Sequence, residues 1–332
     1  MADGRLVIIR ESDFTVVGEV THAAFVGYGF LTFDADDQDT VFAVMEPGTV
    51  VAIDVTTKTA PTVAGTLLED AALAGPTAVW AGNTSIHVAS NTNTSLARVG
   101  TSDLAAMAVN KTLVYASFTN VPDIEPIVNG YGLVACPTTT SVVAGAMFGV
   151  SDELIDATVF TGLVAMAVNS SGGIVYTVAT GSQKLACVDT FDPTDVFVIG
   201  SLSNANFAVA VDITTSGDYA FVATSTGLII IVAVTDPTTP TLVGTYTNPT
   251  GLGTPSSIEY VDGILYIVDS TGSLVSLDTT SDELVDYGEY PLDFDGLYNT
   301  DSRIALRITG PATLMALTYE VDDTDNPARN EG

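Results

Sequence analysis

Residues 227–246 read Gly-Leu-Ile-Ile-Ile-Val-Ala-Val-Thr-Asp-Pro-Thr-Thr-Pro-Thr-Leu-Val-Gly-Thr-Tyr. This stretch predicts an apolar strand, a turn made of Asp, Pro and Thr, and a second strand that contains one small glycine. Degraded copies of it begin at Gly4, Gly48 and Gly272. Such recurrence indicates a repeat architecture, so it decides the fold class before any catalytic motif is considered.

One strand type gives the clearest register. Residues 175–180, 220–224 and 266–270 align at spacings of 44 residues (Thr180 to Thr224) and 46 residues (Thr224 to Ser270). A second apolar strand precedes each of them, and a third and a fourth strand follow, which is the content of one β-propeller blade. Extending the register predicts seven second strands, at Thr40–Met45, Ser85–Ser90, Thr112–Ser117, Ile174–Thr180, Tyr219–Thr224, Leu265–Asp269 and Arg303–Ile308.

We therefore expect an all-β protein, a single seven-bladed β-propeller over residues 1–320, followed by an acidic tail at 321–332. The spacing is irregular around 90–160, which predicts one trimmed blade with insertions at Asn120–Asn129 and Gly149–Phe160.

The two ends of the chain are expected to close the ring. Strands at Gly4 and Phe14–Val20 resemble the third and fourth strands of a blade, and Gly296–Ile308 resembles the first and second. Pairing them in one blade would remove the free sheet edges. Ala312–Tyr319 also has the pattern of a third strand, so the N-terminus is expected to supply only the outermost one or two strands of that blade.

Within residues 227–246, the chain resembles the LVIVD family of β-propellers. Leu228-Ile-Ile-Ile-Val corresponds to its strand, Asp236-Pro-Thr-Thr-Pro240 to its Pro-x-x-Pro turn, and Leu242-Val-Gly244 to its second strand. A fainter match lies at residues 48–65. The resemblance implies a propeller of mostly surface or extracellular type, and it implies no catalytic residues because the motif is a packing motif.

The charge is strongly one-sided. Forty acidic residues oppose nine basic ones, which gives a net charge of −31, and the acids are 29 Asp against 11 Glu, with only three Lys. Repulsion of this size destabilises a fold in dilute buffer, but molar salt shortens the Debye length to about 3 Å. The composition favours a protein from a hypersaline setting over a merely acidic mesophilic one. It also argues against nucleic-acid binding, since no basic footprint is present.

Apolar residues make up 47% of the chain, which is typical of a packed protein. The longest apolar run, Leu228–Val234, is far shorter than the roughly 20 residues of a membrane span, so none is expected. Strand Leu6–Arg10 begins almost at once, and we expect no cleaved leader. Cys136 and Cys187 lie in apolar runs and are expected to be two buried thiols.

Catalysis is not expected. The chain has only His22 and His87, and His87 lies within an apolar strand, where a packed histidine is the ordinary case. No nucleophile elbow, zinc-binding His pair or phosphate loop is present.

A calcium site is a weak expectation. Asp34, Asp36 and Asp39 belong to the densest acidic cluster, and oxygen ligands suit Ca²⁺. However, Asp39 and Met45 stand where an EF-hand loop requires Gly and a bidentate Glu, and acidic turns are common in a chain of this charge. We otherwise expect no cofactor.

The function expected from these observations is a non-enzymatic interaction protein, in its most concrete form a virion spike or capsid-associated protein of a halophilic virus that attaches to a host surface. Its partners would be capsid proteins and a host receptor or glycan, and its location the virion. A haloarchaeal scaffold, in the cytoplasm or at the cell surface, and a calcium-dependent propeller hydrolase or lactonase stay open as alternatives. The candidate contact residues lie in the predicted insertions, at Asn120, Asp123, Glu125, Asn129, Asp152 and Glu153.

The charge leads to a prediction about salt. The melting temperature, followed by calorimetry from dilute buffer to molar KCl, should rise steeply because salt screens the repulsion among surplus carboxylates. A flat dependence would count against the halophilic interpretation.

Overall fold

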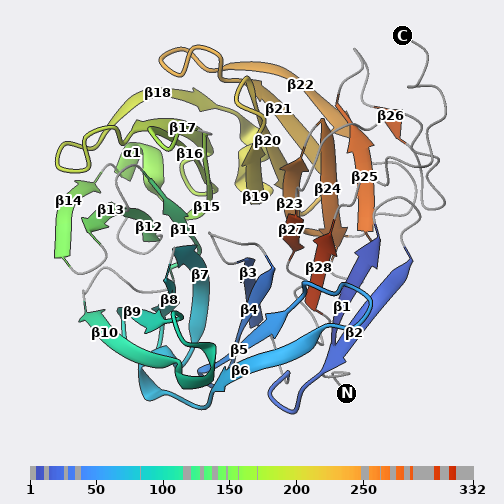
Figure 1. Ribbon diagram of the computed structural model, residues 1–332. Helices are drawn as coiled ribbons and strands as arrows, with labels where there is room; N and C mark the ends of the chain where they lie inside the picture. The colour runs from blue at the N-terminus through green and yellow to red at the C-terminus, as the bar shows by residue number, and fades with distance from the viewer. Residues whose placement is uncertain are drawn as a thin grey trace, which may run out of the picture.

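The chain folds as an all-β propeller, in which small sheets are arranged as a ring around a central axis (Figure 1). The computed structural model describes residues 5–10, 15–25, 29–33, 39–82, 84–114, 121–127, 131–136, 141–146, 149–155, 157–169, 171–247, 254–261, 263–269, 274–279, 285–286, 303–306 and 314–318. The innermost strands contact one another in the cyclic order β3, β7, β11, β15, β19, β23, β27 and back to β3. The expected tail at 321–332 lies outside the described residues.

Five sheets are regular blades, each made of four consecutive antiparallel strands that begin with an innermost strand of at least five residues. The first two are β3 (Gly29–Phe33), β4 (Thr40–Met45), β5 (Thr49–Asp54) and β6 (Thr62–Leu67), and β7 (Pro76–Gly82), β8 (Ser85–Ser90), β9 (Ser95–Gly100) and β10 (Ala108–Val114). The next two are β15 (Leu163–Val168), β16 (Ile174–Ala179), β17 (Lys184–Asp189) and β18 (Phe197–Ser203), and β19 (Ala210–Thr215), β20 (Tyr219–Thr224), β21 (Leu228–Ala233) and β22 (Thr241–Thr247). The fifth is β23 (Pro255–Val261), β24 (Ile264–Asp269), β25 (Leu274–Asp278) and β26 (Val285–Asp286).

Two further four-stranded sheets depart from this pattern. One comprises β11 (Ile124–Pro126), β12 (Gly132–Cys136), β13 (Ser141–Ala146) and β14 (Gly149–Ile155), and its innermost strand has only three residues. The other is assembled from both ends of the chain, in the order β27 (Arg303–Leu306), β28 (Leu314–Thr318), β1 (Arg5–Arg10) and β2 (Val16–Thr21). Its central pair, β1 with β28, is parallel. Of β13, β14, β26, β27 and β28 only the backbone is described.

The prediction of a seven-bladed propeller is corrected to five regular blades and two irregular sheets. One irregular sheet lies at residues 124–155, where the spacing of the repeat is irregular, and the other is built from strands near both ends of the chain. In one of them Pro126 ends the inner strand early, because proline has no N–H to donate to a β-ladder. In the other, the repeat is split between the two termini.

The strand assignments around residues 90–160 and at 303–308 are also corrected. Thr112–Ser117 was expected as a second strand, but residues 112–114 end β10, an outermost strand, and the second strand of the following sheet is β12. The expected insertions Asn120–Asn129 and Gly149–Phe160 instead contain β11 and β14, which are the first and last strands of that sheet. At the C-terminal end, Arg303 begins an innermost strand rather than a second strand.

Helical structure is minor. The described residues contain one short α-helix, α1 (Ala157–Phe160), and the 3₁₀ turns Ala71–Leu73, Leu104–Ala106 and Ala205–Val209. Among them, no helix combines the length and the apolar character needed to cross a membrane.

The core lies between the faces of neighbouring sheets. Every residue of β4, β8, β16 and β24 is buried, because a second strand is covered on both faces by the adjacent blades. One such layer joins Tyr176 and Val178 of one blade to Ile213 and Val222 of the next. Burial on both faces explains why these strands are apolar without alternation.

An aspartate closes the turn that leads to several outermost strands. Asp236 Oδ1 accepts bonds from the Thr238 N–H (3.0 Å) and hydroxyl (2.6 Å), and Asp236 Oδ2 accepts one from the Thr239 hydroxyl (3.1 Å). Asp192 and Asp54 make the corresponding bonds to the residues two positions further on. These hydrogen bonds hold the pKa of each of the three aspartates below its usual value. Part of the acidic content therefore serves local turn structure.

The turns that begin at Asp54 and Asp236 each pack against a glycine of the preceding sheet. A Cβ at Gly200 of β18 would overlap the carbonyl oxygen of Pro237 and lie 2.7 Å from that of Thr238. Gly18 and Gly65 accommodate the carbonyl oxygens of Lys58 and Leu104 in the same way. In all three strands the ladder shifts register by one residue immediately before the glycine. A glycine is thus required at positions 18, 65 and 200 by the close approach of the next blade.

Gly200→Ala should lower the free energy of unfolding by about 1–3 kcal/mol, because the new methyl group displaces the turn of the next blade. Chemical denaturation in molar salt measures it. Gly82→Ala is the matched control, since its Cβ would meet its nearest neighbour at an ordinary 3.6 Å. Equal stability of the two variants would contradict the packing role.

Candidate functional site

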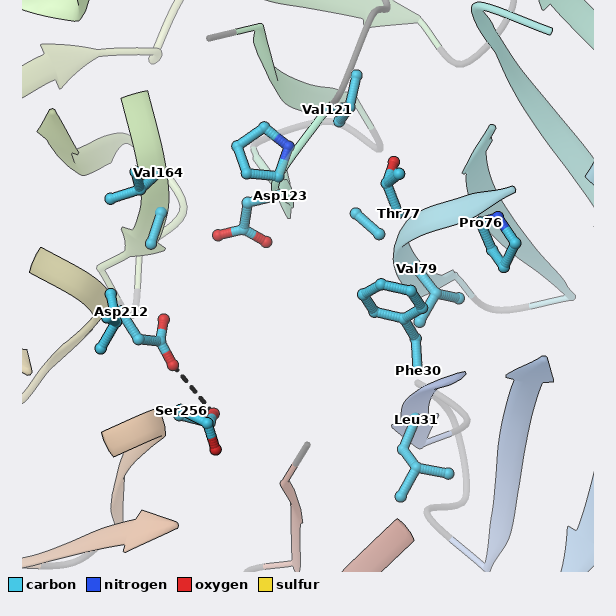
Figure 2. Close-up of a pocket in the computed structure, with 15 residues that line it drawn as sticks. Phe30, Leu31, Pro76, Thr77, Val79, Val121, Asp123, Val164, Asp212 and Ser256 are labelled. Atoms are coloured by element: carbon cyan, nitrogen blue, oxygen red, sulfur yellow. Dashed lines mark hydrogen bonds between the residues drawn. The ribbon is translucent and has the colours of Figure 1, made fainter. Parts of the chain in front are cut away.

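The innermost strands enclose a cavity at the axis of the ring. It comprises two parts of about 420 and 340 Å³, both lined by Leu31, Val79, Asp123, Asp212 and Ser257. Apolar side chains from β3 and β7 form one side of the cavity, and Asp123 and Asp212 lie on the other (Figure 2). Glu125 of β11 and Glu259 of β23 line the smaller part. Several ionisable side chains converge on this cavity.

Two aspartates of the cavity wall connect neighbouring sheets. Asp123 accepts the N–H of Ile124 on Oδ1 (2.9 Å) and that of Met166, on β15 of the next sheet, on Oδ2 (2.8 Å). Asp212 repeats the arrangement with the N–H groups of Ile213 (2.9 Å) and Ile258 on β23 (2.9 Å). Both carboxylates face the cavity in Figure 2, while their oxygens are held by backbone donors.

Asp212 has a third partner, because the Ser257 hydroxyl donates to its Oδ2 at 3.0 Å. A related link joins the same two blades at Thr214. The Thr214 hydroxyl lies 3.5 Å from Glu259 Oε1 and accepts the N–H of Tyr260 at 3.2 Å. The acidic wall is therefore also a set of hydrogen bonds between blades.

Glu125 and Glu259 complete the acidic wall. Burial, and after it repulsion from the nearby Asp212, raise the pKa of Glu259 to about 7. Burial also raises the pKa of Asp123 to about 7, against the opposing effect of its bond from Met166. The pKa of Glu125 lies well above its usual value, first through burial and then through repulsion from Asp123 and Glu259. These side chains are half-buried because they border the cavity.

No Lys, Arg or His is among the described residues that line the cavity, so carboxylates face one another without a basic side chain from those strands. Protons shared within the group are then the simplest way to limit its charge. Chemically, the arrangement can hold and release protons near neutral pH. Within the described ranges, no three His, Cys, Asp or Glu residues are grouped so as to hold a metal ion.

The candidate contact residues are not brought together. Asp123 and Glu125 lie at the axis, whereas Asp152 and Glu153 belong to β14, the outermost strand of the same sheet. Asn120 and Asn129 lie outside the described residues, as do Asp34 and Asp36 of the expected calcium cluster. Asp39 is described through its backbone carbonyl, which accepts the N–H of Val55 at 2.7 Å.

Sequence reasoning missed Asp212 and Glu259. Each is an acid within an otherwise apolar or hydroxyl-bearing first strand, Ala-Val-Asp-Ile-Thr-Thr and Pro-Ser-Ser-Ile-Glu-Tyr-Val. Both acids lie in strands that the repeat aligns as first strands, and this shared position in the sequence was a signal from which they could have been found.

The histidines do not line the cavity. His87 is 3% exposed and stacks on Trp80 with ring centroids 4.7 Å apart, and burial lowers its pKa to about 3. His22 accepts the N–H of Ala24 at 3.2 Å and packs near Phe25. The expectation that His87 is a packed residue is confirmed.

The cysteines are buried and free, as expected. Burial raises the pKa of the Cys187 thiol to about 12, so it is not an activated nucleophile.

Comparison with known proteins supports the repeat in one blade. A family described as the LVIVD repeat matches residues 209–248, which span β19 to β22. That blade is similar to an LVIVD repeat. The match covers 40 of the 332 residues and confirms the resemblance there. No curated protein matches the chain.

Solved structures share the fold over most of the chain. A protein of unknown function from Desulfotomaculum acetoxidans has a TM-score of 0.66 at 13% identity, covering 81% of this chain and 87% of that one. A candidate 6-phosphogluconolactonase from Bacteroides fragilis has a TM-score of 0.66 at 15% identity, and the match covers 79% of this chain and 84% of that one. A catalytically inactive virginiamycin B lyase from Staphylococcus aureus, solved with quinupristin, has a TM-score of 0.61 at 11% identity. The match covers 81% of this chain and 85% of that one. At these identities the likeness concerns the fold alone.

The raised pKa values predict a pH effect on stability. Carboxyl groups that ionise near 3.8 (Asp) or 4.5 (Glu) in the unfolded chain ionise near 7 in the folded one, so the folded state binds more protons between these values. Their contribution to the stability of the fold is fully present below the pKa values of the unfolded chain, and it declines as the pH rises to the folded pKa of about 7.

Glu259→Gln should therefore reduce the decline in melting temperature between pH 4.5 and 7 in molar salt and be more stable than the parent protein at pH 8. Asp195→Asn, at an exposed turn, controls for the removal of one surface charge. The same pH profile in both variants would contradict the axial origin of the effect.

Proposed function

We propose that this protein is a non-enzymatic interaction module, a rigid ring that joins other protein subunits. The observation that carries the proposal is the use of the axial aspartates. Asp123 and Asp212 each accept an N–H from their own strand and another from the next sheet, so their oxygens are committed to holding the ring together. A carboxylate held in this way is a poor general base.

The finer form of the proposal is a spike or capsid-associated protein in the virion of a halophilic virus, which contacts capsid proteins and a host receptor or glycan. The net charge of −31 and the presence of only three Lys support a hypersaline setting. A ring that presents loops from many blades on one face suits attachment. A cellular scaffold of a halophilic archaeon is the alternative with the same chemistry.

Mass spectrometry of purified virus particles and of host fractions separates these two forms. The virion proposal expects peptides of this chain in washed particles at a fixed ratio to the major capsid protein. Detection only in uninfected host cells would contradict the virion proposal and favour the cellular scaffold.

A hydrolase is the second candidate function, and one observation favours it. Glu259 borders a cavity and has a pKa of about 7, which is the property of a general acid or base that works at neutral pH. The likeness to a candidate lactonase concerns the fold alone but makes lactones the natural substrates to test.

The purified protein, with and without Ca²⁺, should be assayed against δ-lactones and simple esters in molar salt. The interaction proposal expects no turnover above the uncatalysed rate. Turnover that falls at least about a hundredfold in Glu259→Gln but not in Asp195→Asn would overturn it in favour of the hydrolase.

A further inference from the structure

The cavity at the axis combines an acidic side with an apolar side. Four carboxyl groups lie on the acidic side, those of Asp123, Glu125, Asp212 and Glu259. The apolar side comes from strands β3 and β7 (Figure 2). A concave site of this size, apolar over much of its wall and with a few converging polar groups, is typical of small-molecule binding.

Glu125 has a carboxylate that the described residues leave unsatisfied. None of them donates a hydrogen bond to it or pairs with it as a cation, and the charged groups that act on it are Asp123, Glu259 and Asp212, all acidic. The side chain is enclosed by the ring, so the surface it leaves exposed faces the cavity. An enclosed carboxylate among like charges is costly unless a positively charged donor accompanies it.

Two further groups on the wall have unused hydrogen-bonding capacity. The Thr77 hydroxyl, on the side of the cavity opposite Asp212 in Figure 2, is buried and has no hydrogen-bond partner among the residues that the structure describes. Glu259 accepts one long bond from those residues, from the Thr214 hydroxyl to Oε1 at 3.5 Å. Buried polar groups are normally satisfied, so several unmet groups around one cavity point to a partner outside the polypeptide.

Trp80 adds an aromatic surface next to the glutamates, because it lines the smaller part of the cavity with Glu125 and Glu259. The indole stacks on His87 with ring centroids 4.7 Å apart. Burial lowers the pKa of His87 to about 3, so this imidazole is neutral and supplies no positive charge to the site. An aromatic ring beside carboxylates is an environment in which proteins bind organic ammonium ions.

The chemistry of the wall favours an organic cation over a metal ion. Within the described ranges, no three His, Cys, Asp or Glu residues are grouped closely enough to hold a metal. An alkylammonium group donates three hydrogen bonds, and its carbon chain can pack on the apolar side. Asp123 and Glu125 are two positions apart at β11, which places them on one face about 6.6 Å apart along the strand. Carboxylates spread along the axis in this way suit a ligand with more than one positive charge.

We propose that the axial cavity binds an aliphatic diamine or longer polyamine, with one ammonium group beside Glu125 and Glu259 and another toward Asp123. Its carbon chain would lie along Leu31 and Val79, which line both parts of the cavity. The inference adds a ligand to the proposed role as an interaction protein and does not depend on that role.

The site should bind the amine more tightly as the pH rises from 6 to 8. Burial raises the pKa of Asp123 and Glu259 to about 7, and that of Glu125 also lies above its usual value, so the amine displaces protons from these groups. Asp212 is the fourth titratable group, and β3, β7 and β15 contribute no ionisable side chain to the described lining. Exposed carboxylates are already ionised at pH 6, and the ammonium groups stay charged at pH 8. Affinity should therefore rise by about tenfold for each axial carboxyl that must ionise.

Isothermal titration calorimetry of the full chain with 1,6-diaminohexane, in 1 M KCl at pH 6 and pH 8, tests the proposal. Salt at this concentration screens diffuse binding to the acidic surface. We expect saturable binding at one site per chain, tighter at pH 8, and no binding of 1,6-hexanediol, which has the same length without the charges. Glu125→Gln and Glu259→Gln should each weaken binding at pH 8 by at least about tenfold, because each removes a charge with little change of shape.

The matched control is Asp195→Asn, which removes one carboxylate from an exposed turn and should bind the diamine as the parent protein does. Circular dichroism verifies that all three variants are folded. The absence of saturable binding, or equal binding by Glu125→Gln and Asp195→Asn, would overturn the inference, and so would an affinity that is the same at pH 6 and pH 8. None of these results bears on the joining of other subunits, which particle mass spectrometry tests separately.

Discussion

The contact between a turn and a glycine of the preceding blade is the constraint on which the ring depends. At Gly200 the backbone of Pro237 and Thr238 approaches so closely that no side chain fits. Asp236 fixes the shape of that turn through its bonds to Thr238 and Thr239. Turn and glycine therefore belong to one packing unit shared by two blades.

Charge is distributed unevenly over this framework. Four carboxylates are gathered at the axis, where burial and mutual repulsion favour the protonated forms of Asp123, Glu125 and Glu259, whereas β18 and β22 at the margin carry none. Two of the axial groups, Asp123 and Asp212, act as acceptors for the backbone of the adjacent sheet. The axis of the protein is thus a region of cohesion between neighbouring sheets.

Sequence patterns predicted the fold where the repeat is intact. Strands β16, β20 and β24 lie where the register of the apolar runs placed them, because strands buried on both faces have an unmistakable composition. Between β10 and β12 the register gave a wrong assignment. Thr112 and Leu113 have the β-forming composition expected of a second strand, but they lie in an outermost strand.

The axial site was only half anticipated. Asp123 and Glu125 were selected as surface contacts, and Asp212 and Glu259 were not selected, because their proximity depends on the closure of the ring and not on local sequence. An acid inside an apolar strand has no obvious partner until the strands meet at the axis.

The parallel pairing of β1 with β28 has a consequence for biogenesis. The first strand of the chain finds its neighbour some 300 residues later, between Leu6 and Leu314. During synthesis, β1 and β2 must therefore remain as an unfinished hairpin with an open edge until the ribosome has synthesised β28. A chain shortened before residue 314 would keep that open edge and would be prone to pair with another nascent chain.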